Sequence, residues 1–377
     1  MENIQKFREI EFLKRDIRLK NGKETTLEKS DIIKDKLNIV YVMTWTEICG
    51  GSKIILEHCN RLSNRGHIIT IISHFPKPNW FDLCESIDFI QVPWEQILCE
   101  SIPKCDIIVA TYWREIYECV EQKIAPVVYF EQGDFHLFDS NNVESNLFNH
   151  IKKQFEFANF IYTVSNYAKD KIFEIYNKES YVINNAINDG IFFKKDNDKK
   201  NNSNNVSITA IGSYYTKFKG IDKILKAIEI LKKENSNINF SWITPDTPEF
   251  HIQSTIVNPT QMQIADILRN TDIYVCASEY ESFCLPVLEA MCCGAAVITT
   301  DNGGVRELVE DNFNALILKN NDVETILEKI RILISDTNLR NRLIENAYEK
   351  SKEFSWDNTI DKLENYYKCI ASYKIIN

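Results

Sequence analysis

The sequence lacks several features that define other classes of protein. It has no apolar run long enough to span a membrane, and no signal peptide opens it. It also has no C-x-x-C pair of the kind that holds structural zinc. Its eleven cysteines are an odd number, and most lie scattered inside apolar runs. This usage is typical of reduced core residues in a cytosolic protein.

The chain also has fewer basic than acidic residues. The chain has 44 lysines and arginines against 54 aspartates and glutamates, which gives a formal net charge of -10. Such a chain would repel the phosphate backbone of nucleic acid, so we expect no broad nucleic-acid binding. Apolar content of 44% and charged content of 26% are globular values, and 377 residues favour two domains of ordinary size.

The most informative stretch is a strand, loop and helix pattern in the second half of the chain. The apolar segment 272–277 is typical of a buried strand, and an apolar segment of helical period follows it. Pro286 is expected at the first helical position, where its missing N–H costs nothing. Three backbone N–H groups at this positive helix end would then form an anion site: those of Phe283, Cys284 and Leu285.

Two carboxylates flank this predicted anion site. Glu281 lies on the loop, and Glu289 lies about one turn inside the helix with a side chain that tilts back toward the N-terminus. Carboxylates do not bind phosphate, but they accept hydrogen bonds from hydroxyls. The implied ligand therefore carries phosphate and sugar hydroxyls, as a nucleotide sugar does. The alternative is that Glu289 only complements the helix dipole and Glu281 is a solvated loop residue.

These residues resemble the signature of retaining GT-B glycosyltransferases usually called family four. The signature reads E-x-F-G-L-P-x-L-E-A-M-x-x-G, and the chain has Glu281-Ser-Phe-Cys-Leu-Pro-Val-Leu-Glu289-Ala-Met-Cys-Cys-Gly294. Cys284 stands where the family usually has glycine, and a side chain there could narrow the approach of the backbone to phosphate. The resemblance covers nearly everything from residue 37 onward.

A second motif lies near the start of the first predicted domain. A strand at 37–43, a loop with Gly50 and Gly51, and a helix from about residue 53 predict the phosphate end of a doubly wound domain. By itself a glycine pair more often marks a plain turn. The resemblance implies that this loop, and Gly51 in particular, lies opposite the phosphates of the donor and close to the acceptor.

Alternating strands and helices continue to about residue 190, which predicts a parallel sheet whose carboxyl-end loops line a cleft. The loop at 131–138 carries Gln132, Asp134 and His136 between aromatic residues, as a sugar-acceptor site would need. The alternative interpretation is a polar connector with His136 exposed to solvent.

The second domain opens with a strand at 206–213 and a helix that ends near residue 231. The resemblance aligns Lys219 with the lysine that pairs with the donor diphosphate, and Lys217 is a possible helper. Ser213 is also assigned to the donor site, but the family often has arginine there, so this chain offers one fork-shaped cation fewer.

The expected domain boundaries follow from these patterns. A helical lead-in covers 1–36, the acceptor-side domain covers 37–190 together with a C-terminal helix at 356–377, a polar linker covers 191–206, and the donor domain covers 207–355. Apolar residues recur in the lead-in at roughly helical spacing, which predicts a helix packed on the first domain; a basic interfacial helix is the alternative. Those residues are Ile4, Phe7, Ile10, Leu13 and Ile17. Asp196 and Asp198 in the linker are predicted to be solvated charge and not a metal site.

The expected fold is α/β, of the GT-B type, with two doubly wound domains facing across a cleft. The resemblance implies transfer of a hexosyl group from a nucleoside diphosphate sugar with retention of configuration, in polysaccharide or glycoconjugate synthesis. Lys219 and the helix end would hold the diphosphate, Glu281 would orient the sugar hydroxyls and Glu289 the ribose. We expect no metal and no separate cofactor, because cationic groups and the helix dipole take their place.

The predicted partners are the donor and a saccharide, lipid-linked or protein acceptor. The predicted location is the cytoplasm, with peripheral contact with the inner membrane face as an option. The sequence leaves the base, sugar, acceptor and oligomeric state open. Two other functions remain open as well: a non-catalytic donor-binding relative, and a nucleotide-sugar epimerase on the same fold, which would need added acid and base groups.

Overall fold

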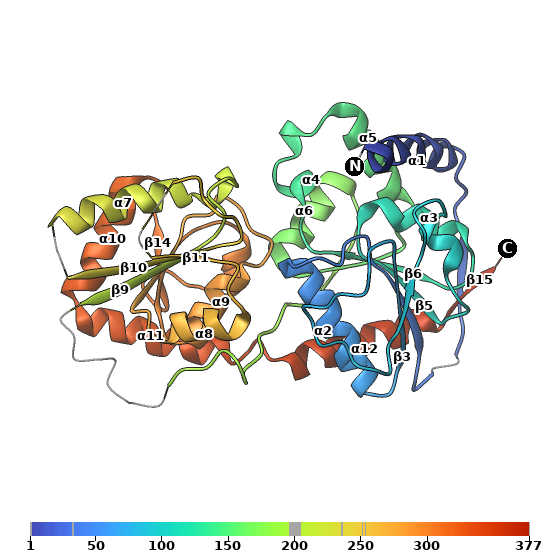
Figure 1. Cartoon of the computed structure of the whole chain (residues 1–377). Helices are drawn as coiled ribbons and strands as arrows, with labels where there is room; N and C mark the ends of the chain where they lie inside the picture. Colours follow the sequence, from blue (N-terminus) through green and yellow to red (C-terminus); the bar gives the residue numbers. More distant parts are fainter. Residues whose placement is uncertain are drawn as a thin grey trace. The chain divides into compact units, whose positions relative to one another are not determined.

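The computed structural model describes residues 2–31, 34–195, 205–234, 237–250, 252 and 254–376. The chain divides into two compact units, Met1–Ile183 with Thr359–Asn377, and Asn184–Asn358 (Figure 1). The first unit ends before the expected boundary at 190. The reason is that the following residues bond to the second unit: Ile187 pairs with Ser355, and the backbone oxygen of Ile191 accepts a hydrogen bond from Arg269 at 2.6 Å. Asp196, Asp198 and most of the predicted linker at 191–206 lie outside the described residues.

The first unit is built on a seven-stranded parallel sheet with the strand order β4-β3-β2-β5-β6-β7-β8. This is a doubly wound order, in which the direction of winding reverses between β2 and β5. The strands are β2 (Asn38–Val42), β3 (Ile68–Ser73), β4 (Asp88–Gln91), β5 (Ile107–Ala110), β6 (Val127–Glu131), β7 (Phe160–Thr163) and β8 (Tyr181–Val182). The central strands β5 and β6 are buried throughout, which matches their continuous apolar runs.

The second unit repeats the same plan with a six-stranded parallel sheet in the order β11-β10-β9-β12-β13-β14. Winding reverses between β9 and β12, which therefore flank the switch point where ligands of such sheets bind. The strands are β9 (Val206–Ile211), β10 (Ile238–Thr244), β11 (Thr255–Val257), β12 (Ile273–Cys276), β13 (Ala296–Thr300) and β14 (Ala315–Leu318).

Helices cover the sheet of each unit. In the second unit, α7 packs with α10, while α9 packs with α8 and α11, and Figure 1 shows these two groups on opposite faces of the sheet. Their bounds are α7 (Ile221–Glu234), α8 (Gln261–Arg269), α9 (Leu285–Cys292), α10 (Val323–Ser335) and α11 (Thr337–Ser351). The helices of the first unit are α1 (Glu2–Lys20), α2 (Gly50–Asn64), α3 (Ile116–Glu121), α4 (Phe135–Phe138), α5 (Ser145–Glu156) and α6 (Asn166–Tyr176).

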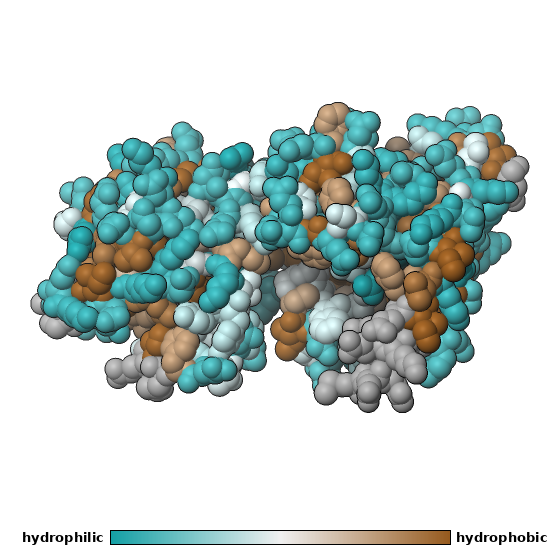
Figure 2. Space-filling view, turned by 90° about the horizontal axis from the view of Figure 1, so that it is seen from above, coloured by the Kyte–Doolittle hydropathy of each residue, from teal (hydrophilic) through white to brown (hydrophobic). Residues whose placement is uncertain are grey.

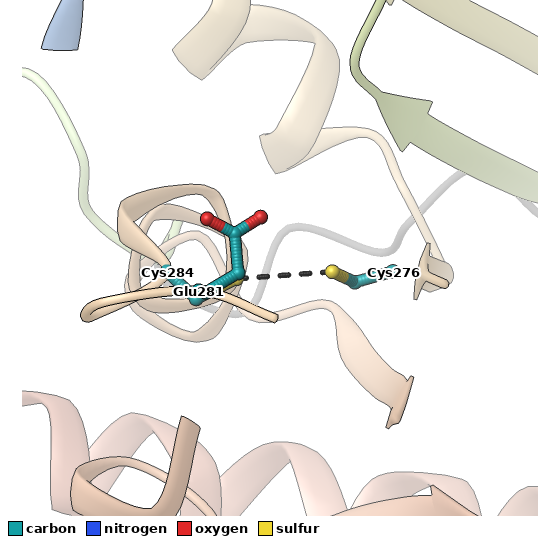
Figure 3. A group of neighbouring side chains, drawn as sticks. All are labelled: Cys276, Glu281 and Cys284. Carbon is teal, nitrogen blue, oxygen red and sulfur yellow. Dashed lines mark hydrogen bonds between the residues drawn. The ribbon is translucent and has the colours of Figure 1, made fainter. Parts of the chain in front are cut away.

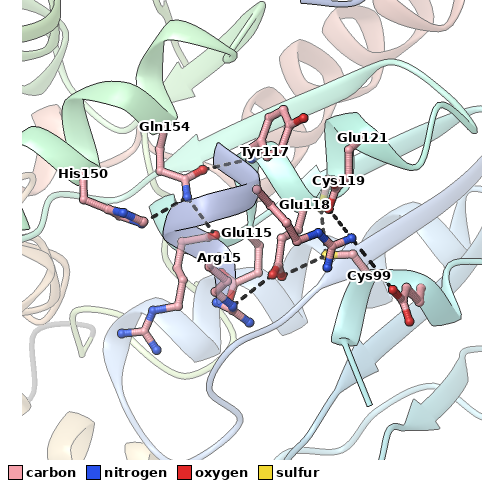
Figure 4. A network of polar contacts seen from close by, with 12 residues as sticks. Arg15, Cys99, Glu115, Tyr117, Glu118, Cys119, Glu121, His150 and Gln154 are labelled. Atoms are coloured by element: carbon pink, nitrogen blue, oxygen red, sulfur yellow. Dashed lines mark hydrogen bonds and ion pairs between the residues drawn. The ribbon is translucent and has the colours of Figure 1, made fainter. Parts of the chain in front are cut away.

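The lead-in helix α1 is attached to the first unit by buried charge as well as by apolar contacts. Arg15 is buried, and its Nε lies 3.0 Å from Glu118 and its Nη1 lies 3.7 Å from Glu115 (Figure 4). Arg18 adds a contact of 2.5 Å to Glu121. Buried charges need such partners, because an isolated charge in the interior is very costly. The network fixes which face of α1 points inward.

The predicted helix does pack on the first unit, but the described residues of its apolar stripe face solvent, and the side chains of Ile4 and Phe7 lie outside the described part of the chain. Ile10, Leu13 and Ile17 are all exposed, because the ion pairs of Arg15 and Arg18 occupy the inward face. Elsewhere the surface in Figure 2 is mostly hydrophilic with separate hydrophobic patches. None of the described helices is long and apolar enough to cross a membrane. Membrane contact through α1 stays a prediction.

The helix α12 (Trp356–Ala371) carries the chain back to the first unit, to which the residues from Thr359 belong. The hydroxyl of Tyr367 lies 3.0 Å from those of both Tyr41 and Tyr162, in the buried core. After the helix, β15 (Tyr373–Ile376) pairs with β1 (Thr26–Lys29) in an antiparallel ribbon.

A charged cluster on α12 also holds the helix in place. Glu364 accepts a hydrogen bond of 2.8 Å from Arg65, lies 2.8 Å from Lys368 and lies 3.3 Å from His67. Burial opposes ionisation of this carboxyl group, but the hydrogen bonds from Lys368 and Arg65 outweigh it and lower the pKa of Glu364 to about 2. The carboxylate therefore stabilises the fold while it is ionised.

We expect Glu364→Gln to lower the free energy of unfolding by about 1.5 to 3 kcal/mol at neutral pH, as measured in urea. The wild-type contribution is fully present above the ordinary carboxyl pKa of 4.5 and is lost as pH falls toward 2, so the two proteins should converge in acid. Asp361→Asn is the matched control, because Asp361 also pairs with Arg65 but is exposed, and should cost below about 1 kcal/mol. A loss of stability independent of pH would contradict this account.

Candidate active site

The candidate site of the second unit lies at the switch point of its sheet. The loop after β9 carries Lys219, and the loop after β12 carries Glu281, and these two strands are neighbours. Parallel strands present their carboxyl ends at one edge, so residues 62 apart in sequence meet there. The location is the one at which doubly wound sheets bind their ligands.

Lys219 and Glu281 form a direct ion pair. The Nζ atom of Lys219 donates to Oε1 of Glu281 at 2.6 Å, and the two side chains are 26% and 15% exposed. Burial opposes the charge on Lys219, but Glu281 outweighs it through its own charge and the hydrogen bond, so the pKa of Lys219 is raised. A cation and a carboxylate are thus held together, partly desolvated, where both remain reachable.

The loop that carries Lys219 approaches the loop after β12 very closely. Gly220 has a φ of 64°, and a Cβ atom on it would lie 2.4 Å from the backbone oxygen of Ala277. Glu279 N donates to the backbone oxygen of Phe218 at 2.7 Å, and the ring of Phe218 stacks on that of Tyr280. Only glycine allows this approach, which explains why glycine must follow Lys219.

The loop that carries Glu281 is fastened to the loop after β13. Glu281 N donates to the backbone oxygen of Asn302 at 3.0 Å, and Gly304 N donates back to the oxygen of Glu281 at 3.0 Å. A Cβ on Gly304 would lie 2.5 Å from Phe283 N, so no other residue fits without movement. Our site prediction did not include Gly304, although the glycine pair that follows the strand, Gly303 and Gly304, is a visible signal in the sequence.

The start of α9 differs from the prediction in one respect. Cys284 is the N-cap with φ 68° and ψ 60°, so the helix begins at Leu285 and Pro286 is its second residue. Left-handed backbone at this point explains why glycine would suit the position. The predicted N–H groups of Phe283, Cys284 and Leu285 do lie at this helix end, where first-turn donors have no intrahelical partner.

The side chain of Cys284 is buried and points toward Cys276. Its sulfur lies 3.7 Å from that of Cys276, and both residues are buried (Figure 3). The hydrogen bond between the two thiols is the main cause of their opposite shifts: it lowers the pKa of Cys276 to about 7 and raises that of Cys284. The steric effect of a side chain in place of glycine on phosphate binding stays a prediction.

The remaining predicted donor residues differ in burial and in the contacts they make. Glu289 is the fifth residue of α9 and is half-buried. Ser213 is buried and donates its hydroxyl hydrogen bond to Asp246, which follows β10. Lys217 is exposed, and its Nζ lies 4.7 Å from the centre of the Tyr214 ring. Lys219, and not Lys217, is therefore the lysine that meets Glu281.

In the first unit, the structure brings Gly51 and Gln132 together. Gly51 lies in the first turn of α2, which follows β2, and its backbone oxygen accepts a hydrogen bond from Nε2 of Gln132 at 3.2 Å. Asp134 caps α4 by accepting from Phe135 N at 2.8 Å. Burial and the neighbouring Glu131 raise the pKa of Asp134.

His136 does not face solvent. Its ring is fully buried, with Nε2 3.3 Å from Glu131 and Nδ1 2.9 Å from the hydroxyl of Tyr176. Glu131, at the end of β6, is itself buried and needs these partners; it also accepts from Tyr129 at 2.6 Å. The interpretation of His136 as exposed to solvent is wrong, because the sequence does not show that Glu131 is buried; its assignment to the acceptor side stays a prediction.

Comparison with known structures agrees with the fold of the two units. Two doubly wound units with parallel sheets define the GT-B fold. A solved sucrose-phosphate synthase from Thermosynechococcus elongatus superposes with a TM-score of 0.74 at 14% identity, over 88% of this chain and 98% of that one. Anabaena Alr3699/HepE, solved in complex with UDP-glucose, gives 0.71 at 16% identity, over 87% and 98%. The chain therefore has the GT-B fold.

The family follows from sequence comparison. Residues 251–350 match the model of the glycosyl transferases group 1 family. An uncharacterized glycosyltransferase of Methanocaldococcus jannaschii, MJ1178, is 26% identical over 55% of this chain and 59% of its own length, so the match spans about three fifths of that relative. N-acetyl-alpha-D-glucosaminyl L-malate synthase of Bacillus anthracis is 22% identical over 84% of this chain and 93% of its own length.

Proposed function

We propose that this protein is a glycosyltransferase that moves a hexosyl group from a nucleoside diphosphate sugar to an acceptor hydroxyl. The observation that carries the proposal is the Lys219–Glu281 pair at the switch point of the second unit, beside the start of α9. Diphosphate needs a cation and backbone donors, and sugar hydroxyls need a carboxylate. The bound UDP-glucose of the Anabaena protein and the family match support a donor of this class.

In the proposed reaction, Lys219 and the N–H groups at the start of α9 bind the diphosphate. They stabilise the negative charge that develops on the leaving oxygen as its bond to the anomeric carbon breaks. Glu281 accepts hydrogen bonds from the sugar hydroxyls and fixes the orientation of the ring, while Glu289 binds the ribose. A new bond forms between the acceptor oxygen and the anomeric carbon, and the acceptor proton passes to the leaving phosphate on the same face, which retains the configuration.

We propose that the acceptor side includes Gln132 and Asp134, on the loop after β6. Gln132 is tied to Gly51 by its side-chain nitrogen, and Asp134 has a carboxyl group whose pKa is raised by burial. The acceptor is a saccharide, a lipid-linked molecule or a protein, and the reaction would serve polysaccharide or glycoconjugate synthesis in the cytoplasm. His136 supports this loop from inside through Glu131.

One observation favours a non-catalytic donor-binding protein as the second candidate. Ser213 stands where relatives often carry arginine, and the structure directs its hydroxyl to Asp246 and not to the helix end. A carboxylate in that neighbourhood weakens the attraction for a diphosphate. If the carboxylate weakens stabilisation of the leaving diphosphate more than it weakens binding, the protein would bind a nucleotide sugar without transferring it.

The proposal is tested by incubating the protein with a panel of nucleoside diphosphate sugars and measuring the released nucleoside diphosphate and the anomer formed. We expect release from one class of donor, retention in the product, and no loss of rate in excess chelator, since Lys219 and the helix end supply the positive charge. A rate restored only by magnesium or manganese would contradict the mechanism. Binding without release would select the non-catalytic candidate, and a changed sugar without transfer would select an epimerase.

A further inference from the structure

Two thiols and a carboxylate form a compact cluster beside the proposed donor site. One ligand atom from each of Cys276, Glu281 and Cys284 lies within 4.8 Å of the others (Figure 3). Among the described residues, this is the one group of three or more such side chains close enough to hold a metal ion. The three residues come from the end of β12, the following loop and the cap of α9.

The spacing of the two sulfur atoms suits a tetrahedral metal ion. They lie 3.7 Å apart. Two thiolates on one zinc ion lie about 3.8 Å apart, because each Zn–S bond is about 2.3 Å long. A disulfide would require the sulfurs to move about 1.7 Å closer. The observed separation therefore favours two ligands of one ion over a disulfide.

The surroundings of the cluster also suit a bound ion. Tyr274 lies two residues before Cys276 on β12, so its side chain points to the same face of the sheet. Its hydroxyl is fully buried and has no hydrogen-bond partner in the described part of the chain. A water molecule in the fourth position of the ion would give such a hydroxyl a partner.

We propose that Cys276, Cys284 and Glu281 form a binding site for one thiophilic divalent ion, of which Zn²⁺ is the representative. Binding releases the two thiol protons to solvent and leaves two thiolates and one carboxylate oxygen on the ion. Soft sulfur ligands select zinc or cobalt over magnesium, which prefers oxygen ligands only. The proposed site, with two sulfur ligands, therefore differs in chemistry from the oxygen-ligated magnesium sites that bind diphosphates.

Occupancy would also switch off the proposed reaction. Glu281 cannot coordinate the ion and remain fully available to Lys219 and the sugar hydroxyls, because its carboxylate now pairs with Lys219 at 2.6 Å. The ion would therefore act as an inhibitor of transfer. This consequence rests on the proposed function, whereas binding of the ion does not.

The test is a titration of the full chain with Co²⁺ in a reductant that is not a thiol, followed by displacement with Zn²⁺. We expect one equivalent of cobalt with a thiolate-to-cobalt absorption band, which zinc then removes. Cys276→Ala should weaken binding by more than about a hundredfold, since even groups outside the ligand shell change affinity ten- to a hundredfold. Cys284→Gly is the second variant, because glycine suits the backbone at φ 68° and the protein should fold.

Cys99→Ala is the matched control. Cys99 and Cys119 are another pair of buried thiols, 3.5 Å apart, in the first unit. This variant should keep the band. Absence of the band in the wild-type protein, its persistence in both site variants, or its loss in Cys99→Ala would each overturn the proposal. The titration needs no sugar donor, so its outcome is independent of whether any nucleotide sugar is a substrate.

Discussion

Replacing Glu281 by alanine is expected to abolish measurable sugar transfer while nucleoside diphosphate still binds. In the proposed complex its carboxylate contacts sugar hydroxyls, and these contacts set the orientation in which the anomeric carbon reacts. Removal of a single hydrogen-bonding group from an oxyanion hole lowers kcat by about 10²- to 10³-fold, and a loss of this size would leave little measurable transfer. The diphosphate should bind at least as well, because Lys219 loses the carboxylate that neutralises it at 2.6 Å.

Glu279→Ala is the matched control for this experiment. Glu279 lies on the same loop as Glu281, but its side chain is more exposed than that of Glu281. It pairs with Lys223 at 3.3 Å and not with Lys219. Its removal should leave kcat within about twofold, as expected for a surface ion pair. Equal loss of transfer in both variants would show that loop structure, and not the Glu281 carboxylate, limits the reaction.

Lys219→Ala is expected to weaken nucleoside diphosphate binding by about ten- to a hundredfold. A charge-assisted contact to phosphate is worth about 1.5 to 3 kcal/mol when partly desolvated, and each 1.4 kcal/mol is a factor of ten. The variant also leaves the Glu281 carboxylate without its cation, which repels the ligand. The loss should be larger at low salt than at high salt. Calorimetric titration with nucleoside diphosphate measures it.

Lys217→Ala separates the two lysines of this loop. Lys217 is exposed and rests on the ring of Tyr214, so its removal should change affinity by less than about threefold. If Lys217→Ala abolished binding while Lys219→Ala left it unchanged, the assignment of this loop would be out of register by two residues. The proposed donor site would then have to be rebuilt around Lys217.

The sequence predicted the two sheets and both members of the central pair, but not that they touch. Lys219 and Glu281 were each identified from a short motif. Their contact depends on β9 and β12 being neighbours, which follows from the winding of the whole unit and not from either motif. When two residues meet because their strands are neighbours in a sheet, the sequence shows the motif of each residue but not the contact between them.

The predictions from the sequence that failed concern the directions in which side chains point. The sequence did not show the direction of the Cys284 side chain. A left-handed backbone at this residue directs the side chain toward Cys276. His136 was expected at a surface, yet a buried carboxylate, Glu131, holds it inside. Ile10, Leu13 and Ile17 on α1 were expected to pack inward, but the ion pairs of Arg15 and Arg18 lie on the inward face. In each case a local pattern gave the element, and a contact that the pattern does not show decided the direction of the side chain.

The most direct test of the central claim is calorimetric titration of the wild-type chain with nucleoside diphosphate sugars, since it needs no knowledge of the acceptor. We predict one binding site for one class of these donors, affinity that falls in Lys219→Ala, and free nucleoside diphosphate as a competitor. Absence of binding for every nucleotide sugar, or equal affinity in the wild type and in Lys219→Ala, would contradict the account.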